Sequence, residues 1–380
     1  MVLKRPLTGC DHIMEKSKKH YAVIIGARPN FVKAAPFFRE AKLHPEYVFT
    51  LIHTGQHFDD SMSKIFFDEM SIPRPDIQLD IQGEFHTEKI GKMFSALKNV
   101  IRGRDFAGVI VFGDINSTLA GAIAAAKANI KLIHIESGLR SHDRRMPEEI
   151  NRVIVDHLSD LLFITESVAK KNLVQEGIGE DKIKLVGNIM IESLEVYSDL
   201  INRSNILSEL KLTPKQYTVA TIHRAENTDS PEILEKILNI FKEYSNKNVL
   251  VFPLHPGTKK KIADYGLESF LNGIKVIEPL GYFEFIKLVS ESCGIVTDSG
   301  GIQEEASHLG IPCATLRDNT ERPITIELGS NKLFPINIIH AGYAKEIERH
   351  LNRTDFKNHH IPLWDNRVSQ RIFKYLDDFS

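Results

Sequence analysis

Three carboxylates of this 380-residue chain stand where acid–base chemistry could be done. Asp114 and Glu136 each end an apolar, β-branched run, so their side chains could converge at one rim of a parallel sheet. Glu148 follows Pro147, which suits the first turn of a helix. Carboxylates around one cleft can act as acid and base when their environments push their pKa values apart. The neighbouring Glu149 is expected only to complement the helix dipole.

A second group of residues suits an anion such as phosphate. The sequence DSGGIQEEASHLG follows an apolar run and places Ser299, Gly300 and Gly301 between a strand and a helix. Glycine allows a sharp turn and the close approach of a ligand, and the helix N-terminus offers free N–H groups. Glu304 and Glu305 would repel phosphate, so at least one should face other groups, such as sugar hydroxyls. The alternative is that the glycines only close a turn and the glutamates lie in solvent.

Two basic segments could complete such a site. Arg28, in GARPN, is expected at a helix N-terminus, where its guanidinium could hold a diphosphate bidentately. Lys33 lies one helical turn further on. His223, in HRAEN, ends a strand-like run and could donate to a phosphate or transfer a proton. The alternatives are a surface arginine and a histidine that caps a polar loop.

Several common cofactor motifs are missing from the sequence. GARPNF is not the G-x-G-x-x-G fingerprint and no P-loop occurs, which argues against an ordinary nicotinamide enzyme and a P-loop NTPase. The histidines lack H-E-x-x-H spacing, and the three cysteines fit neither a zinc site nor a disulfide framework. We therefore expect no metal and no cofactor.

The elements that must position these residues alternate between strands and helices. Short apolar runs separated by helical stretches are typical of parallel strands buried on both faces, so the pattern predicts an α/β protein. The runs expected as strands are 21–26, 47–53, 107–113, 130–136, 217–223, 248–255, 274–280, 293–297 and 311–316.

The alternation starts afresh after about residue 188, which predicts two Rossmann-like domains with parallel sheets. We expect a basic, irregular leader at 1–19 and domains at 20–188 and 189–360. The remaining residues, 361–380, have helical periodicity and are expected to dock back onto the first domain.

Composition excludes several classes of partner. The chain is 42% hydrophobic and 26% charged, and its formal net charge of −2 gives no global field that would recruit nucleic acid or an anionic membrane. No apolar run approaches the length of a membrane span, and the first 19 residues contain no signal-peptide stretch. With so few cysteines, we expect a cytoplasmic protein that binds neither nucleic acid nor membranes.

Taken together and in order, these segments closely resemble the non-hydrolysing UDP-N-acetylglucosamine 2-epimerases. Any one motif would be weak, whereas the ordered set is very specific and covers almost the whole chain after the leader. The motifs are GARPNFVKAAP, HTGQHFDDSM, GDINSTLA, HIESGLRS, MPEEINR, GN, HRAEN, VTDSGGIQEEASHLGIPC and RDNTERP. The resemblance implies a GT-B fold with the active site between two domains, a homodimer, and a role in making precursors of cell-surface polysaccharides.

The resemblance also implies roles for individual residues. The acid–base candidates are Asp114, Glu136, Glu148 and His223. The candidates for binding the UDP-sugar are Arg28, Lys33, His223, Ser299, Gly300, Gly301 and Glu305, of which Glu305 would take the ribose hydroxyls.

Some positions depart from the family pattern. Asn30 stands where relatives usually show Glu, and GDINS replaces a threonine-rich version. TGQH, with Gln56 and His57, resembles part of a second site through which substrate activates many bacterial members. Only this part of that site is matched, which leaves allosteric activation open.

The chemistry that the resemblance implies is elimination and readdition. UDP leaves C1 as a proton leaves C2, a glycal forms beside UDP, and protonation of C2 from the other face precedes readdition. The alternatives are a hydrolysing epimerase that releases free N-acetylmannosamine, a 2-epimerase of a modified UDP-sugar such as a diacetamido uronic acid, a GT-B glycosyltransferase, and a non-catalytic nucleotide-sugar sensor.

Overall fold

The structure of the chain is a computed structural model. It describes residues 18–55, 67, 70–79, 81, 86–353, 355–358 and 360–379. Gln56 and His57 of the TGQH motif lie outside the described residues, as does the predicted leader except for its last two residues. Lys19, the last residue of the predicted leader, is the first residue of the first strand.

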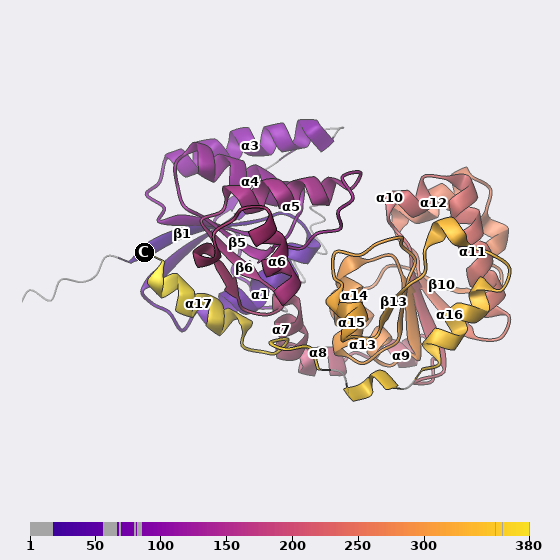
Figure 1. The fold of residues 1–380 in the computed structure, drawn as a ribbon. Helices are drawn as coiled ribbons and strands as arrows, with labels where there is room; N and C mark the ends of the chain where they lie inside the picture. Colours follow the sequence, from indigo (N-terminus) through magenta and orange to yellow (C-terminus); the bar gives the residue numbers. More distant parts are fainter. Residues whose placement is uncertain are drawn as a thin grey trace, which may run out of the picture.

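Two lobes, each built on a parallel sheet, make up the molecule (Figure 1). Among the described residues the first sheet has the strand order β3-β2-β1-β4-β5-β6-β7 and the second has β10-β9-β8-β11-β12-β13. The strands of the first sheet are β1 (Lys19–Ile25), β2 (Tyr47–His53), β3 (Ile77–Gln78), β4 (Gly108–Phe112), β5 (Leu132–Ser137), β6 (Leu161–Ile164) and β7 (Ile183–Leu185). Those of the second are β8 (Tyr217–Thr221), β9 (Val249–Pro253), β10 (Lys275–Ile277), β11 (Gly294–Thr297), β12 (Cys313–Thr315) and β13 (Asn331–Leu333).

Helices cover these sheets and connect their strands (Figure 1). In the first lobe they are α1 (Arg28–Ala41), α3 (His86–Arg102), α4 (Asn116–Lys127), α5 (Pro147–Leu158), α6 (Ser167–Gln175) and η1 (Glu180–Lys182). Between the lobes lie α7 (Ile189–Val196) and α8 (Ser198–Asn202). In the second lobe they are α9 (Ile206–Glu209), α10 (Ala225–Thr228), α11 (Pro231–Ser245), α12 (Pro256–Asp264), η2 (Glu268–Leu271), α13 (Tyr282–Ser290), α14 (Gly300–His308), α15 (Ile324–Glu327), η3 (Ile336–Ile338) and α16 (Tyr343–Leu351). The chain ends with η4 (Asp355–Asn358) and α17 (Val368–Asp378).

The observed strands confirm the predicted α/β class. Every predicted run contains a strand, and the strands pair in parallel, because buried β-branched runs need helical crossovers. Strands β3, β6, β7 and β13 were not among the predicted runs. Each has only two to four residues, too few to show a clear period.

Each sheet has one point at which its strand order reverses. In the first sheet the reversal lies between β1 and β4, and in the second it lies between β8 and β11. Loops after these strands diverge to opposite sides, which opens a crevice at the carboxyl ends where ligands bind in open α/β sheets. The fold therefore supplies two crevices, one in each lobe.

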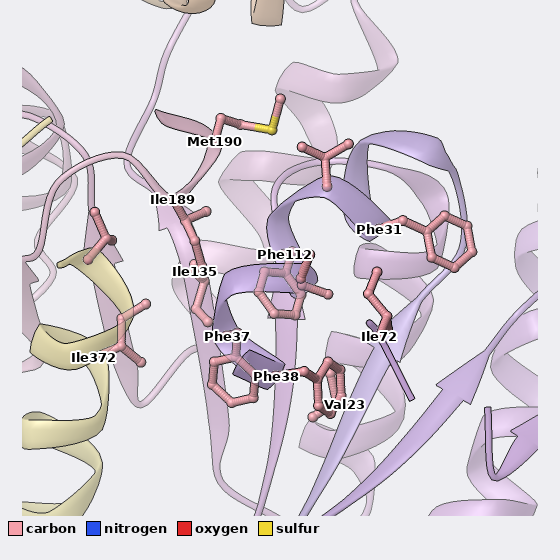
Figure 2. Close-up of a cluster of buried hydrophobic side chains, with 14 of the residues drawn as sticks. Val23, Phe31, Phe37, Phe38, Ile72, Phe112, Ile135, Ile189, Met190 and Ile372 are labelled. Carbon is pink, nitrogen blue, oxygen red and sulfur yellow. The ribbon is translucent and has the colours of Figure 1, made fainter. Parts of the chain in front are cut away.

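The core of the first lobe reaches beyond its own sheet. Figure 2 shows Phe37 and Phe112 between Ile135 and the α1 residue Phe38, with Ile189 of α7 and Ile372 of α17 in the same cluster. All of these side chains are buried. One helix that precedes the second sheet in sequence, α7, and one that follows it, α17, thus help to fill the core of the first lobe.

The C-terminal segment returns to the first lobe, where α17 packs on α1. The ring of Phe373 is fully buried, with its centroid 5.0 Å from that of Phe37 and 4.4 Å from that of His44. The helix begins at Val368 rather than near residue 361, because Trp364 instead packs in a separate buried cluster ahead of it.

Gly187 allows the returning segment to lie against the junction of the lobes. Its φ of 91° is left-handed, and a Cβ at this position would come 2.0 Å from the carbonyl oxygen of Leu363. The next residue, Asn188, caps α7 through a bond from the Met190 amide. We propose that the chain divides here, with domains at 20–188 and 189–360 and a returning segment at 361–380.

Replacing Phe373 with alanine should lower the free energy of unfolding by about 3–5 kcal/mol, since the cavity would open between α17 and α1. Urea unfolding followed by circular dichroism measures this loss. The exposed neighbour Lys374 is the control, and Lys374→Ala should change stability by less than about 0.5 kcal/mol. A Phe373→Ala loss below about 1 kcal/mol would contradict the packing of α17.

Candidate active site

A cleft with a volume of about 450 Å³ lies between the two lobes. Both crevices contribute to it, since residues that follow β1, β4, β8 and β11 all line it. Of the predicted site residues, those that line the cleft are Lys33, Asp114, Glu148, His223, Ser299, Gly300, Gly301 and Glu305. The structure therefore brings together side chains that are up to about 270 residues apart in the sequence.

Asp114 follows β4 and forms an ion pair with Arg152 of α5. The Arg152 guanidinium is buried and also lies 2.8 Å from Glu149. Burial alone would raise the pKa of Asp114, but Arg152 and then Lys33 outweigh it, and the pKa is lowered. Asp114 is therefore held ionised, which suits a proton acceptor.

Glu136 is buried at the end of β5 in a left-handed conformation, with φ of 69°. The ladder between β5 and β6 shifts register at this residue, between Ile135 and Ser137. A left-handed glutamate costs energy and persists only where its surroundings enforce it. One carboxylate oxygen lies 2.5 Å from Lys33 Nζ and the other 3.2 Å from Arg322 Nη2.

Glu148 and Glu149 differ in a way that the sequence did not predict. Glu148 lines the cleft and is partly exposed. Glu149 is buried, pairs with Arg152, and accepts bonds of 2.9 Å from the amides of Ser141 and His142. The expectation that Glu149 only complements the helix dipole is wrong, because it also fixes the loop before α5 and the partner of Asp114.

Arg322 is a buried cation that contacts both lobes, and sequence reasoning did not single it out. Its guanidinium contacts Glu136 of the first lobe, and in its own lobe it contacts Glu304 at 2.9 Å and Glu321. We refer to these four residues as the Arg322 cluster. Arg322 and Arg317 outweigh burial and hold the pKa of Glu321 well below its ordinary value. The only sequence signal was the position of this arginine within the RDNTERP motif.

The helix α14 begins at the cleft with the predicted glycines. A Cβ at Gly300 would lie 2.6 Å from Arg322 Nη1, so the arginine packs directly on this residue. A Cβ at Gly301 would meet only Met190, at 3.9 Å, which leaves room for a ligand above the helix N-terminus. Glu305 is buried one turn into the helix and lines the cleft.

Glu304, next to Glu305, has a structural partner from the junction of the lobes. Asn188 Nδ2 donates to one of its oxygens at 2.8 Å, and Arg322 pairs with the other. Burial raises the pKa of Glu304 to about 7, despite the opposing effect of Arg322. The expectation that at least one of the two glutamates faces something other than phosphate is met by Glu304.

His223 follows β8 and is oriented by Asp298, the residue that follows β11. The ring Nδ1 lies 2.9 Å from the buried Asp298 carboxylate, which also accepts from the backbone amides of His223 and Arg224. These bonds outweigh burial and lower the pKa of Asp298. An ionised carboxylate on Nδ1 fixes the ring and directs Nε2 away from Asp298.

Part of the lining of the cleft is apolar and includes Pro253, Leu280, Phe285 and Ile302. A flat, weakly polar group would suit these side chains, whereas anions suit the N-terminus of α14. Arg28 begins α1 at the cleft, as predicted, but its side chain lies outside the described part of the chain.

The fold and the site together define a class of protein. Two parallel-sheet lobes that enclose a nucleotide-type crevice constitute a GT-B fold, and the structure resembles Acinetobacter baumannii MurG in fold alone, with 12% identity and a TM-score of 0.53. The likeness is greater to a crystal structure of Methanocaldococcus jannaschii UDP-GlcNAc 2-epimerase in complex with UDP-GlcNAc and UDP. That structure gives a TM-score of 0.88 at 38% identity, covering 94% of this chain and 99% of the other.

Comparison of sequences identifies the family. The model described as UDP-N-acetylglucosamine 2-epimerase matches residues 39–377. The chain is 40% identical to the M. jannaschii UDP-N-acetylglucosamine 2-epimerase, over 93% of this chain and 98% of the relative. It is 42% identical to a Pseudomonas aeruginosa UDP-2,3-diacetamido-2,3-dideoxy-D-glucuronate 2-epimerase, over 82% and 86%. This chain belongs to the UDP-N-acetylglucosamine 2-epimerase family.

None of the helices in the described ranges is long and apolar enough to cross a membrane. Within the same ranges, no group of three or more His, Cys, Asp or Glu side chains is arranged to hold a metal ion.

Glu166 is a further carboxyl group near the junction of the lobes. It immediately precedes α6 and is buried, and within the described structure its Oε1 has no hydrogen-bond partner. Burial, and then the nearby Glu304, raise its pKa to about 8 from an ordinary value of 4.5. The folded protein therefore favours the protonated form of Glu166.

The free energy of unfolding should fall as the pH rises from the ordinary pKa of 4.5 to the pKa of about 8 in the folded protein, because the folded state releases the Glu166 proton at a higher pH than the unfolded chain does. Glu166→Gln mimics the protonated form and removes the loss. The free energy of unfolding of the variant relative to that of the wild type should rise by at least about 1 kcal/mol between about pH 5 and about pH 8. Urea unfolding at several pH values measures it, with the exposed Glu180→Gln as control. A pH-independent difference would contradict the assignment.

Proposed function

We propose that this protein interconverts UDP-N-acetylglucosamine and UDP-N-acetylmannosamine without hydrolysis. The observation that carries the proposal is the composition of the cleft. Asp114 and Glu148 of one lobe line the cleft opposite a helix N-terminus on the other lobe, and Arg322, which also lines it, reaches the buried Glu136 of the first lobe. Reversal at C2 needs proton transfer on one side and a place for a diphosphate on the other, and this cleft has both.

The proposed pose of the substrate follows from the polarity of the cleft. The diphosphate lies over Ser299 and Gly300, where α14 begins, within reach of Arg322 and His223. Glu305, buried one turn further, accepts from the ribose hydroxyls, and the uracil occupies the apolar end beside Phe285. Binding of a UDP-sugar is supported by the related M. jannaschii structure, which is described as a complex with UDP-GlcNAc and UDP.

In this pose the sugar points at the carboxylates of the first lobe. A base removes the C2 proton while the C1–oxygen bond breaks, and the electron pair of the C–H bond forms the C1–C2 double bond of a glycal. The departing diphosphate is stabilised by α14, Arg322 and Arg28. A group on the opposite face then returns a proton to C2 as the diphosphate oxygen adds back to C1. Asp114, which is held ionised, suits the role of a base.

A closed cleft favours readdition over loss of the glycal. The contact of Arg322 with Glu136 across the junction supports this proposal, because it holds the lobes together at the reaction centre. We also propose that the product feeds the synthesis of cell-surface polysaccharides, which rests on the family resemblance.

A second candidate is 2-epimerisation of a diacetamido uronic acid linked to UDP. The observation that favours it is the 42% identity to the P. aeruginosa enzyme named for that activity. Both candidates share the chemistry at C1 and C2 and differ in the groups at C3 and C6 of the sugar. Assays with each UDP-sugar under the same conditions distinguish them.

A homodimer is the assembly that we propose, following the family resemblance. Its support in the structure is the outer face of α5, where Ile150 and Ile154 are 45% and 37% exposed. Large aliphatic side chains on one helix face are typical of subunit contacts. Light scattering that gives the mass of a single chain would contradict it.

Incubation with UDP-N-acetylglucosamine in deuterated water tests the reaction. We expect UDP-N-acetylmannosamine that carries deuterium at C2, because the proton removed exchanges with solvent before another is returned. Proton NMR measures both the product and the label. Free N-acetylmannosamine as the main product would favour a hydrolase, and retention of protium at C2 would overturn elimination.

Mutations on the two sides of the cleft should have different effects, one on the rate and the other on UDP affinity. Asp114→Asn, Glu136→Gln and Glu148→Gln each delete one ionisation and should slow the reaction by at least about 10²-fold with little effect on UDP affinity. Glu305→Ala should instead weaken UDP by roughly 1–3 kcal/mol. Glu149 cannot serve as a neutral control, since it is buried and paired, so the exposed Glu235→Gln of α11 is used. Calorimetry and initial rates measure the two effects, and unchanged UDP affinity in Glu305→Ala would remove Glu305 from the site.

A further inference from the structure

A buried histidine lies beneath the two carboxylates that end β4 and β5. His134 is completely buried, and its ring Nδ1 lies 2.7 Å from Asp156 Oδ1 while Nε2 lies 2.8 Å from the carbonyl oxygen of Gly113. Neither partner has a hydrogen to donate, if Asp156 is ionised. Both ring nitrogens therefore donate, and the ring is an imidazolium paired with Asp156.

Asp156, on α5, is ionised and holds more than the histidine. Bonds from His134 and the charge of Arg140 outweigh burial and lower the pKa of Asp156. Its second oxygen accepts from the Gly138 amide at 3.1 Å and lies 2.7 Å from Arg140 Nη1. Arg140 in turn donates to Glu176 through two bonds of 2.8 and 2.7 Å. Charged side chains of alternating sign therefore form a row that leads from the C-terminal end of α6 to His134. They are Glu176, Arg140, Asp156 and His134.

These hydrogen bonds hold the chain on both sides of Glu136 and the backbone immediately before Asp114. His134 and Gly138 stand two residues before and two residues after Glu136, and a single carboxylate, that of Asp156, binds both. The segment between them contains the left-handed Glu136 and the shift in register. The same imidazolium fixes the carbonyl of Gly113, the residue that leads into Asp114.

We propose that the His134–Asp156 pair is the positioning element that aims both Asp114 and Glu136 at the sugar. The proposal rests on the proposed function for the identity of the reaction. Neither residue lines the cleft, so both act through the backbone and are positioning residues. A buried ion pair is a poor source of stability compared with apolar packing, whereas it defines geometry sharply. Displacements of about 1 Å at a reacting group can cost about 10²-fold in rate.

Asp156→Asn is the principal test, since it keeps the size of the side chain and removes its charge. The asparagine oxygen can replace only one of the two acceptor oxygens, so it cannot hold both His134 and Gly138. We expect kcat to fall about 10- to 100-fold while the Kd for UDP changes by less than about twofold. In a crystal structure of the variant, Glu136 should leave the left-handed region.

His350→Asn is the matched control. His350 is also a buried histidine bonded to a backbone carbonyl, that of Cys313 at 2.9 Å, but it lies on α16 in the second lobe. This variant should lose stability and keep kcat. An Asp156→Asn variant that keeps both kcat and the Glu136 conformation, or a similar fall of kcat in His350→Asn, would overturn the proposal.

Neutron diffraction of the wild-type protein, soaked in deuterated buffer, gives a test that needs no variant to fold. Deuterium on both ring nitrogens of His134 would support the imidazolium, and a bare ring nitrogen would overturn it. The two failures are distinguishable. A wild type that does not epimerise UDP-N-acetylglucosamine refutes the proposed function, whereas the nitrogen occupancy and the Glu136 conformation in Asp156→Asn still decide the positioning role.

Discussion

The structure is organised around one interaction, which is the contact of the buried Arg322 guanidinium with carboxylates of both lobes. A guanidinium removed from water is tolerated only where carboxylates surround it. Glu304 and Glu321 supply two of these from the second lobe, and Glu136 supplies the third from the first. The contact between Arg322 and Glu136 therefore ties the two lobes together beside the cleft.

The rest of the fold places the partners of that charge. The reversals of strand order put the ends of β4 and β5 opposite the start of α14, and α7 with α17 fills the core beneath them. Asp114 follows β4 and Glu136 lies at the end of β5, where the backbone is less regular and Glu136 is left-handed, and we propose that this backbone aims both carboxylates. Strain of this kind is typical of functional sites, because it must be maintained by neighbouring contacts. The same charges that would steady an oxyanion thus also hold the acid–base groups in place.

Much of this could be predicted from the sequence, because strand ends are marked by a change from apolar to polar residues. That change located Asp114, Glu136 and His223, and the glycines located the start of α14. Partners across the chain could not be predicted in the same way. Arg322 contacts Glu136 only after both lobes have folded. The two residues are 186 positions apart in the sequence, so no local sequence pattern indicates their contact. Glu149 was misjudged because the first turn of a helix favours glutamate whether or not the side chain is buried.

The central claim is that the bond between C1 and the diphosphate breaks and forms again inside this cleft. The most direct measurement uses UDP-N-acetylglucosamine labelled with ¹⁸O at the oxygen that bridges C1 and the β-phosphorus, followed by ³¹P NMR during epimerisation. If UDP departs and returns, its terminal phosphate can rotate while it is free, and the label should move into the non-bridging positions of the recovered UDP-sugars. Epimerisation at C2 with the label retained entirely in the bridge would contradict the account.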